Sequence, residues 1–202
     1  MIEKNLIING REFNYKGIFR TDEIFSTINR ALEEKDYQKR EKKTEELVTE
    51  SGRKVFVELR PFKEVSNYIH LMIKIKVYLE NVTETTELIE EEKKHFQKGD
   101  VKIVFDSWIL SDYENRWGMQ PWTYFFKSFV NKFIYNLPTE SGFKSELVQD
   151  TVFIYAKIKK LFHSYKGEVG KTISEDLIKK EVEAEINAEI EKSHKQKPEE
   201  IY

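Results

Sequence analysis

The segment with the clearest chemical potential is Asp112 to Trp117, which gathers acidic, aromatic and basic side chains into six residues. The guanidinium of Arg116 could hold a ligand carboxylate or phosphate through two parallel hydrogen bonds. Tyr113 and Trp117 would then lie beside it at the mouth of a pocket. Equally, Arg116 could pair with Glu114 or Asp112, and Trp117 could pack at the start of the following helix. Both interpretations stay open from the sequence.

Other residue types give little sign of catalysis. The chain has no cysteine, which excludes disulfides, thiol catalysis and cysteine-based zinc sites. Its four histidines are not spaced as zinc ligands, and His70 has no identifiable catalytic partner. Residues 167–172 end in Gly-Lys-Thr but lack the first glycine of a phosphate-binding loop and follow a predicted helix. We therefore expect no metal and no cofactor.

The charge balance argues against a nucleic-acid partner. Lysine and arginine number 34 against 36 acidic residues, for a net charge of −2, whereas nucleic-acid binders usually carry a basic excess. The basic run at residues 39–43 is interrupted by Glu41 and is expected to be a solvated helix end. Phe56, Tyr68 and Tyr78 could stack bases on a sheet, but without a basic excess we expect ordinary strand aromatics.

No targeting or membrane-spanning segment is predicted. The apolar stretch at the N-terminus is too short for a secretory signal. The longest uncharged run, Trp117–Phe126, has ten residues, and a spanning helix needs about 20. Only two lysines flank the aromatic residues of the 122–133 segment, so contact with a membrane surface is not expected either. A soluble, cytoplasmic protein is the expectation.

The first half of the chain is predicted to begin with a strand over residues 5–19, folded into a hairpin at Asn9-Gly10. A helix capped by Thr21 follows and is expected to continue to the basic run near residue 43. A turn at Ser51-Gly52 then separates two short strands.

The middle of the chain alternates apolar and polar residues, which is typical of strands with one buried face. Strands are expected over residues 67–80, 83–90 and 101–113, with a charged loop and a Gly99-Asp100 turn before the last. The predicted buried face consists of Ile69, Leu71, Ile73, Ile75, Val77, Leu79, Val101, Ile103, Phe105, Ser107 and Ile109.

The apolar spacing returns to a helical period after Arg116. One helix is expected from about Trp122 to Leu137, and a second over residues 143–165. The last segment, 167–202, is acidic and is expected to hold an exposed or loosely docked helix over 172–192, followed by a disordered end. We therefore predict one α+β domain over 1–166 and a charged helical tail over 167–202.

This order of elements resembles the helix-grip fold of the START and Bet v 1-like superfamily, over roughly residues 5–165. In that fold a curved antiparallel sheet wraps a long C-terminal helix. The resemblance implies a pocket for a hydrophobic small molecule. It does not imply one activity, because one fold serves many functions.

Three hypotheses follow. The first is a non-enzymatic module that holds an apolar small molecule or segment between the sheet and the C-terminal helices. The second is a protein-interaction module with a filled core, acting through the tail helix. The third is a cavity enzyme of cyclase or hydrolase type, for which the predicted apolar faces offer few polar groups. The candidate cavity and rim residues are Ile73, Ile75, Phe105, Tyr113, Arg116, Trp117, Trp122, Phe126 and Tyr155. The candidate partner-binding residues of the tail are Leu177, Val182, Ile186 and Ile190.

Overall fold

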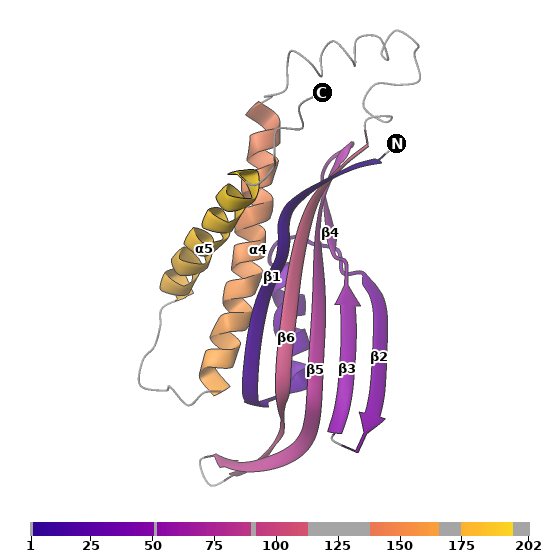
Figure 1. The fold of residues 1–202 in the computed structure, drawn as a ribbon, viewed down its shortest axis with the longest axis vertical. Coiled ribbons are helices and arrows are strands. Elements are labelled where there is room, and N and C mark those ends of the chain that lie inside the picture. Colours follow the sequence, from indigo (N-terminus) through magenta and orange to yellow (C-terminus); the bar gives the residue numbers. More distant parts are fainter. Residues whose placement is uncertain (1, 51, 90–91, 113–137, 166–174, 196–202) are drawn as a thin grey trace.

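The computed structural model describes residues 2–50, 52–89, 92–112, 138–165 and 175–195 (Figure 1). This part of the chain forms a curved antiparallel sheet and three helices, two of them at its C-terminal end. The predicted α+β class is confirmed. The elements are β1 (Ile2–Phe19), α1 (Thr21–Glu33), β2 (Glu41–Thr49), β3 (Gly52–Leu59), β4 (Phe62–Ser66), β5 (Ile69–Ile89), β6 (Glu92–Asp112), α4 (Pro138–Tyr165) and α5 (Glu175–Lys195).

The sheet places the first strand next to the last. Its order is β1-β6-β5-β3-β2, and the short β4 also pairs with β5. All pairs are antiparallel. β1 and β2 therefore form the two edges of the sheet (Figure 1).

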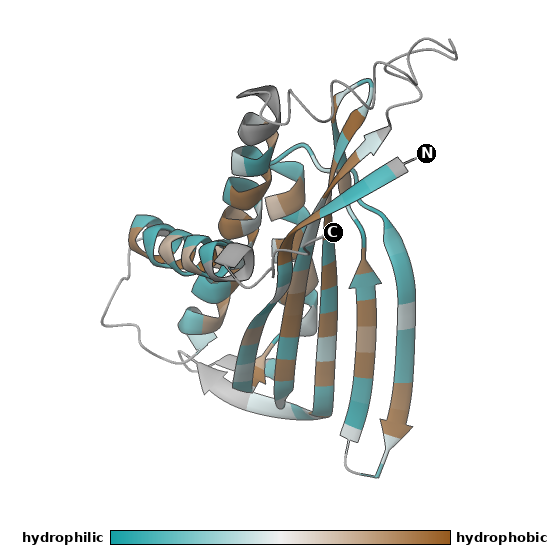
Figure 2. Ribbon diagram, turned by 45° about the horizontal axis from the view of Figure 1, so that its top comes forward, coloured by the Kyte–Doolittle hydropathy of each residue, from teal (hydrophilic) through white to brown (hydrophobic). Residues whose placement is uncertain are grey.

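The two faces of the sheet differ because apolar and polar residues alternate along its long strands. The predicted buried face is confirmed: all six alternating residues from Ile69 to Leu79 are buried, as are their counterparts from Val101 to Ile109 on β6. Figure 2 shows the alternation as bands of hydrophobic and hydrophilic colour along the strands. The helices lie on the apolar face.

Helix α4 is the main cover of this face. It contacts β1, β6, β5 and α1, and α5 packs on its other side and reaches β1. The predicted helix over 143–165 is confirmed, and it begins earlier, at Pro138. A buried pair of hydroxyls joins α4 to the apolar face of the sheet at the predicted inward position Ser107: its Oγ lies 2.9 Å from Thr151 Oγ1. Thr151 also donates to the backbone carbonyl of Leu147, so the hydroxyls are buried without loss of hydrogen bonds.

β1 is one continuous strand, so the predicted hairpin at Asn9-Gly10 is wrong. The pairing of β1 with β6 shifts register between Leu6 and Arg11, which marks a β-bulge. Gly10 has a φ of 68° there, in the left-handed region that glycine adopts readily. Its N–H donates to Asp106 Oδ1 at 2.8 Å. An Asn-Gly pair favours the same backbone conformation in a bulge as in a turn, so the local sequence does not distinguish a bulge from a turn.

The predicted loop before the last strand is also wrong. β6 begins at Glu92 and pairs with β5 all the way from Ile89, so the Gly99-Asp100 pair lies inside a strand. The strands predicted over 67–80 and 83–90 are likewise one strand, β5, with a register shift between Glu80 and Thr83. Charged residues extend this hairpin where we expected them to interrupt it.

Helix α1 ends at Glu33, well before the predicted end. Asp36, with a φ of 59°, turns the chain, and the basic run at 39–43 leads into β2 instead of closing a helix. The predicted cap is also wrong. Arg20 occupies the N-cap position without a side-chain cap, and the N–H of Thr21 donates to Gln97 Oε1 of β6 at 3.1 Å.

Gly99 is required at the register shift in the long hairpin. A Cβ at this position would lie 2.7 Å from the backbone oxygen of Glu80, closer than any ordinary contact, and the backbone cannot yield as a flexible side chain would. We expect Gly99→Ala to lower the free energy of unfolding by about 1–3 kcal/mol, as measured by urea denaturation.

The matched control is Gly142→Ala in α4, where a Cβ meets nothing within 4 Å. Alanine favours a helix over glycine, so this variant should gain roughly 0.5–1 kcal/mol. Equal effects of the two substitutions would contradict the close approach at Gly99.

Candidate functional site

The predicted cavity residues of the sheet and of α4 lie in a filled core. Ile73, Ile75 and Phe105 have no exposed surface, and Tyr155 is 6% exposed. The rings of Phe105 and Tyr155 pack at a centroid distance of 5.6 Å, and the Tyr155 hydroxyl donates to the backbone carbonyl of Glu12 at 3.2 Å. The structure thus brings these four residues together as packing partners.

The other candidate rim residues lie outside the described part of the chain. They are Tyr113, Arg116, Trp117, Trp122 and Phe126. The predicted helix over 122–137 lies there as well.

The apolar stripe of the tail helix packs against its own chain. Val182 and Ile186 are fully buried in the same core as the sheet, Ile190 packs at its margin, and Leu177 is 61% exposed. Ile178 is buried in place of Leu177. The prediction named Val182, Ile186 and Ile190 but missed that a spacing of four residues places 178, and not 177, on the same face of the helix.

Arg11 of β1 fastens α5 to the edge of the sheet. Its guanidinium forms ion pairs with Glu185 and Glu189 and lies 5.2 Å from the centroid of the Tyr155 ring. A third ion pair joins Lys159 of α4 to Glu181 at 3.1 Å. α5 is therefore held by apolar burial together with charge pairs at its rim.

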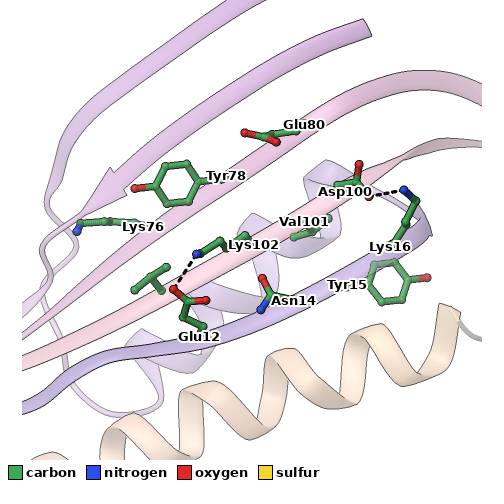
Figure 3. Close-up of a pocket in the computed structure, with 11 residues that line it drawn as sticks. Glu12, Asn14, Tyr15, Lys16, Lys76, Tyr78, Glu80, Asp100, Val101 and Lys102 are labelled. Carbon is green, nitrogen blue, oxygen red and sulfur yellow. Dashed lines mark ion pairs between the residues drawn. The ribbon is translucent and has the colours of Figure 1, made fainter. Parts of the chain in front are cut away.

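The face of the sheet opposite the helices carries the candidate site. Two adjoining hollows of about 790 and 540 Å³ lie on it and share Tyr78 and Glu80 in their lining. We call them together the trough. Figure 3 shows the larger hollow, with side chains from β1, β5 and β6 rising from the sheet.

One cross-strand row forms the centre of the trough. Pairing between neighbouring strands aligns Glu45, Phe56, Tyr78, Lys102 and Asn14 in turn across β2, β3, β5, β6 and β1. Directly opposed residues of an antiparallel pair share a face. The rings of Phe56 and Tyr78 pack at 4.9 Å, which makes an aromatic pair with charged neighbours on both sides.

Ion pairs border the β1 end of the trough (Figure 3). Lys102 lies 2.7 Å from Glu12, and Lys16 lies 3.2 Å from Asp100. The hydrogen bond from Lys102 lowers the pKa of Glu12. Hydrogen bonds from Asn81 and Lys16 lower the pKa of Asp100. Both carboxylates are therefore acceptors that stay charged at neutral pH.

Asp106 is a buried acidic residue on the same face of the sheet. It is 6% exposed, accepts the N–H of Gly10, and lies 3.1 Å from Lys74 Nζ and 3.8 Å from Lys76 Nζ. A buried carboxylate needs such partners. The ammonium of Lys74 also lies 4.8 Å from the centroid of the Trp108 ring. Asp106 therefore fixes the bulge of β1 and two lysines of the uncovered face at once.

A second buried carboxylate, Asp150, has a structural role. It is 3% exposed and lies 3.3 Å from Lys35 and 3.5 Å from Lys63. Burial, with the charge of Asp150 nearby, raises the pKa of Tyr37, so this hydroxyl stays neutral. The ion pairs of Asp150 join α4 to β4 and to the turn that follows α1.

Two kinds of feature are absent from the described residues. No group of three or more histidine, cysteine or acidic side chains among them is placed to hold a metal ion. None of the helices that the structure describes is long and apolar enough to cross a membrane. The trough offers an aromatic surface, ammonium groups and charged acceptors.

Comparison of the chain with protein-family models, with curated proteins and with solved structures finds no match in any of the three.

The docking of α5 gives a direct test. Ile186 is fully buried, so Ile186→Ala should lower the free energy of unfolding by about 2–5 kcal/mol, through lost apolar contacts and the cavity left behind. Leu177→Ala, on the exposed side of the same helix, should change it by less than about 0.5 kcal/mol. Urea denaturation of both variants measures the difference. A tail that packs on nothing would show no effect at either position.

Proposed function

We propose that this protein is a non-enzymatic binding module of helix-grip-like architecture that binds a protein partner in the trough on its uncovered sheet face. The observation that carries the proposal is the aromatic pair of Phe56 and Tyr78, set among charges on a face that no described helix covers. The helix-grip-like assignment is supported by the curved sheet, by the pairing of the first strand with the last, and by the long helix on the apolar face.

The form of the trough suits a polypeptide better than a small molecule. Small-molecule sites are concave, mostly apolar pockets that enclose most of the ligand. The trough is open and crosses all five strands of the sheet path. Protein interfaces combine an aromatic centre with a polar rim, which is the arrangement around Phe56 and Tyr78.

The opposite face favours the same conclusion. A side chain that lines a ligand cavity keeps accessible surface, and Ile73, Ile75 and Phe105 have none. The hypothesis of an apolar small molecule held between the sheet and the C-terminal helices would require these groups to move apart. Native mass spectrometry of the protein purified from its own host tests it, because a bound molecule is lost as mass on denaturation. A co-purified apolar molecule would favour that hypothesis over ours.

Site-specific photo-crosslinking tests the proposal directly. Leu47 lines the trough and Leu177 lies on α5, and both are 61% exposed. A photoreactive residue at position 47, in the native host, should yield an adduct of one defined mass. The same residue at 177 should yield none, although it is equally accessible.

The adduct must also depend on the trough. We expect Phe56→Ala to reduce its yield at least about tenfold, since aromatic anchors at interface centres carry much of the binding energy. Leu177→Ala should leave the yield unchanged. An adduct at 177 alone would instead support an interaction through the tail helix. No adduct at 47, or one that persists in Phe56→Ala, would overturn the proposal. An adduct with twice the mass of the chain would be a cross-link between two copies of the protein, and it would not count as evidence for a partner.

A further inference from the structure

β2 is an open edge of the sheet. Among the described strands it pairs only with β3, and eight of its nine residues are exposed. Nothing lies beyond it in the described structure (Figure 1). The opposite edge, β1, is instead contacted by α5. Unpaired N–H and C=O groups on such an edge can accept a further strand.

The charges of β2 are arranged in mirror fashion around one residue. Lys42 and Lys43 precede Thr44, and Glu45 and Glu46 follow it. We propose that two copies of this chain pair antiparallel through β2, with Thr44 on the two-fold axis. This inference goes beyond the proposed partner binding and does not depend on it.

The charge pattern selects this register over its neighbours. With Thr44 on the axis, Lys43 faces Glu45 of the second copy, and Lys42 faces Glu46 of the second copy. Both pairs occur twice by symmetry. A shift of the axis by one residue, to Glu45 or to Lys43, places Glu45 against Glu45 or Lys43 against Lys43. Like charges directly opposite each other are destabilising.

The same register accounts for two exposed apolar residues. Val48 is 78% exposed and Leu47 is 61% exposed, although large apolar groups on an open edge favour unwanted association. In the paired sheet Val48 faces Arg40 of the second copy, whose aliphatic stem can cover it. Leu47 faces Glu41 in the same way.

The pairing forms a closed dimer. Each chain contributes the same edge strand, so both β2 edges are occupied in the dimer and no further chain can add to form a fibre. Because Thr44 faces Thr44, the two sheets join with their uncovered faces on the same side, and the two troughs lie side by side. The contact is small, which places it among weak interfaces. Its exposed charge pairs should make it weaker at high salt.

Cysteine cross-linking tests the register. The chain has no cysteine of its own, so each variant carries a single reporter. Thr44→Cys should oxidise to a disulfide-linked dimer, because the two residues meet at the axis. Val48→Cys should not, although it is highly exposed, because four residues on each side of the axis separate the two sulfurs by about 27 Å. Equal cross-linking of both variants, or none at Thr44→Cys, would overturn the proposal.

Charge exchange tests the complementarity. Sedimentation equilibrium should show the mass of the wild type rising above 24.2 kDa with concentration. Lys43→Glu and Glu45→Lys should each weaken the dimer by about tenfold, since each replaces two attractive pairs by repulsive ones. An equimolar mixture of the two variants, and the double variant, should recover wild-type affinity because opposite charges again face each other.

Circular dichroism confirms the fold of each variant. A wild type that stays monomeric at every concentration, or a mixture that fails to recover association, would contradict the inference. Either result leaves β2 open to a strand of another protein and leaves the proposed partner binding intact.

Discussion

The structure depends on one constraint: the sheet has two faces, and the described helices cover only one. Strict alternation along β5 and β6 commits every second residue to the covered face, where Leu71, Ile73 and Phe105 exclude solvent completely. The intervening residues are mostly polar and partly exposed, as at Lys74, Lys76, Tyr78 and Lys102, although Val104 and Asp106 are buried on that face as well. A filled apolar layer and an open polar face are therefore two results of the same pattern. We place the proposed site on the open face because Ile73, Ile75 and Phe105 on the covered face keep no accessible surface.

Asp106 connects the open face of the sheet to the bulge of β1 and, through it, to α5. Its backbone lies in the central strand pair, and its carboxylate is buried on the face that otherwise meets solvent. The group holds Gly10 at the bulge and thereby sets how β1 crosses β6. Since Arg11 follows directly and binds α5, the bulge also sets where the last helix is fastened. A local backbone irregularity thus positions an element at the far end of the sequence.

Sequence patterns predicted the regular elements and failed where a local signal has two uses. Alternation identified the buried face of β5 and β6 correctly, because burial of one face is a property of the whole strand. Asn9-Gly10 and Gly99-Asp100 fit turns and bulges equally well, and only the partner strand decides between them. Charged residues misled the prediction in the same way, because Glu41, Lys42 and Lys43 begin β2 and Glu92 begins β6. Within the candidate site, the sequence identified Phe56 and Tyr78 as aromatic residues on strands. It could not identify their neighbours from β1 and β6, because those neighbours are set by the order of strands in the sheet, which no local pattern specifies.

The pairing of the first strand with the last has a consequence for how the chain is made. Among the described strands β1 pairs only with β6, with Ile2 opposite Asp112 and Phe19 opposite Gln97. On the ribosome, β1 therefore leaves the exit tunnel long before the strand that will hold it. Helix α1, β2 and β3 can form local contacts during that time, but β1 must wait with its apolar residues unburied. Such long-range pairing slows folding and lengthens the exposure of aggregation-prone segments. The charged residues Glu3, Lys4, Arg11, Glu12 and Lys16, spread along β1, keep this waiting strand from binding to other chains too early.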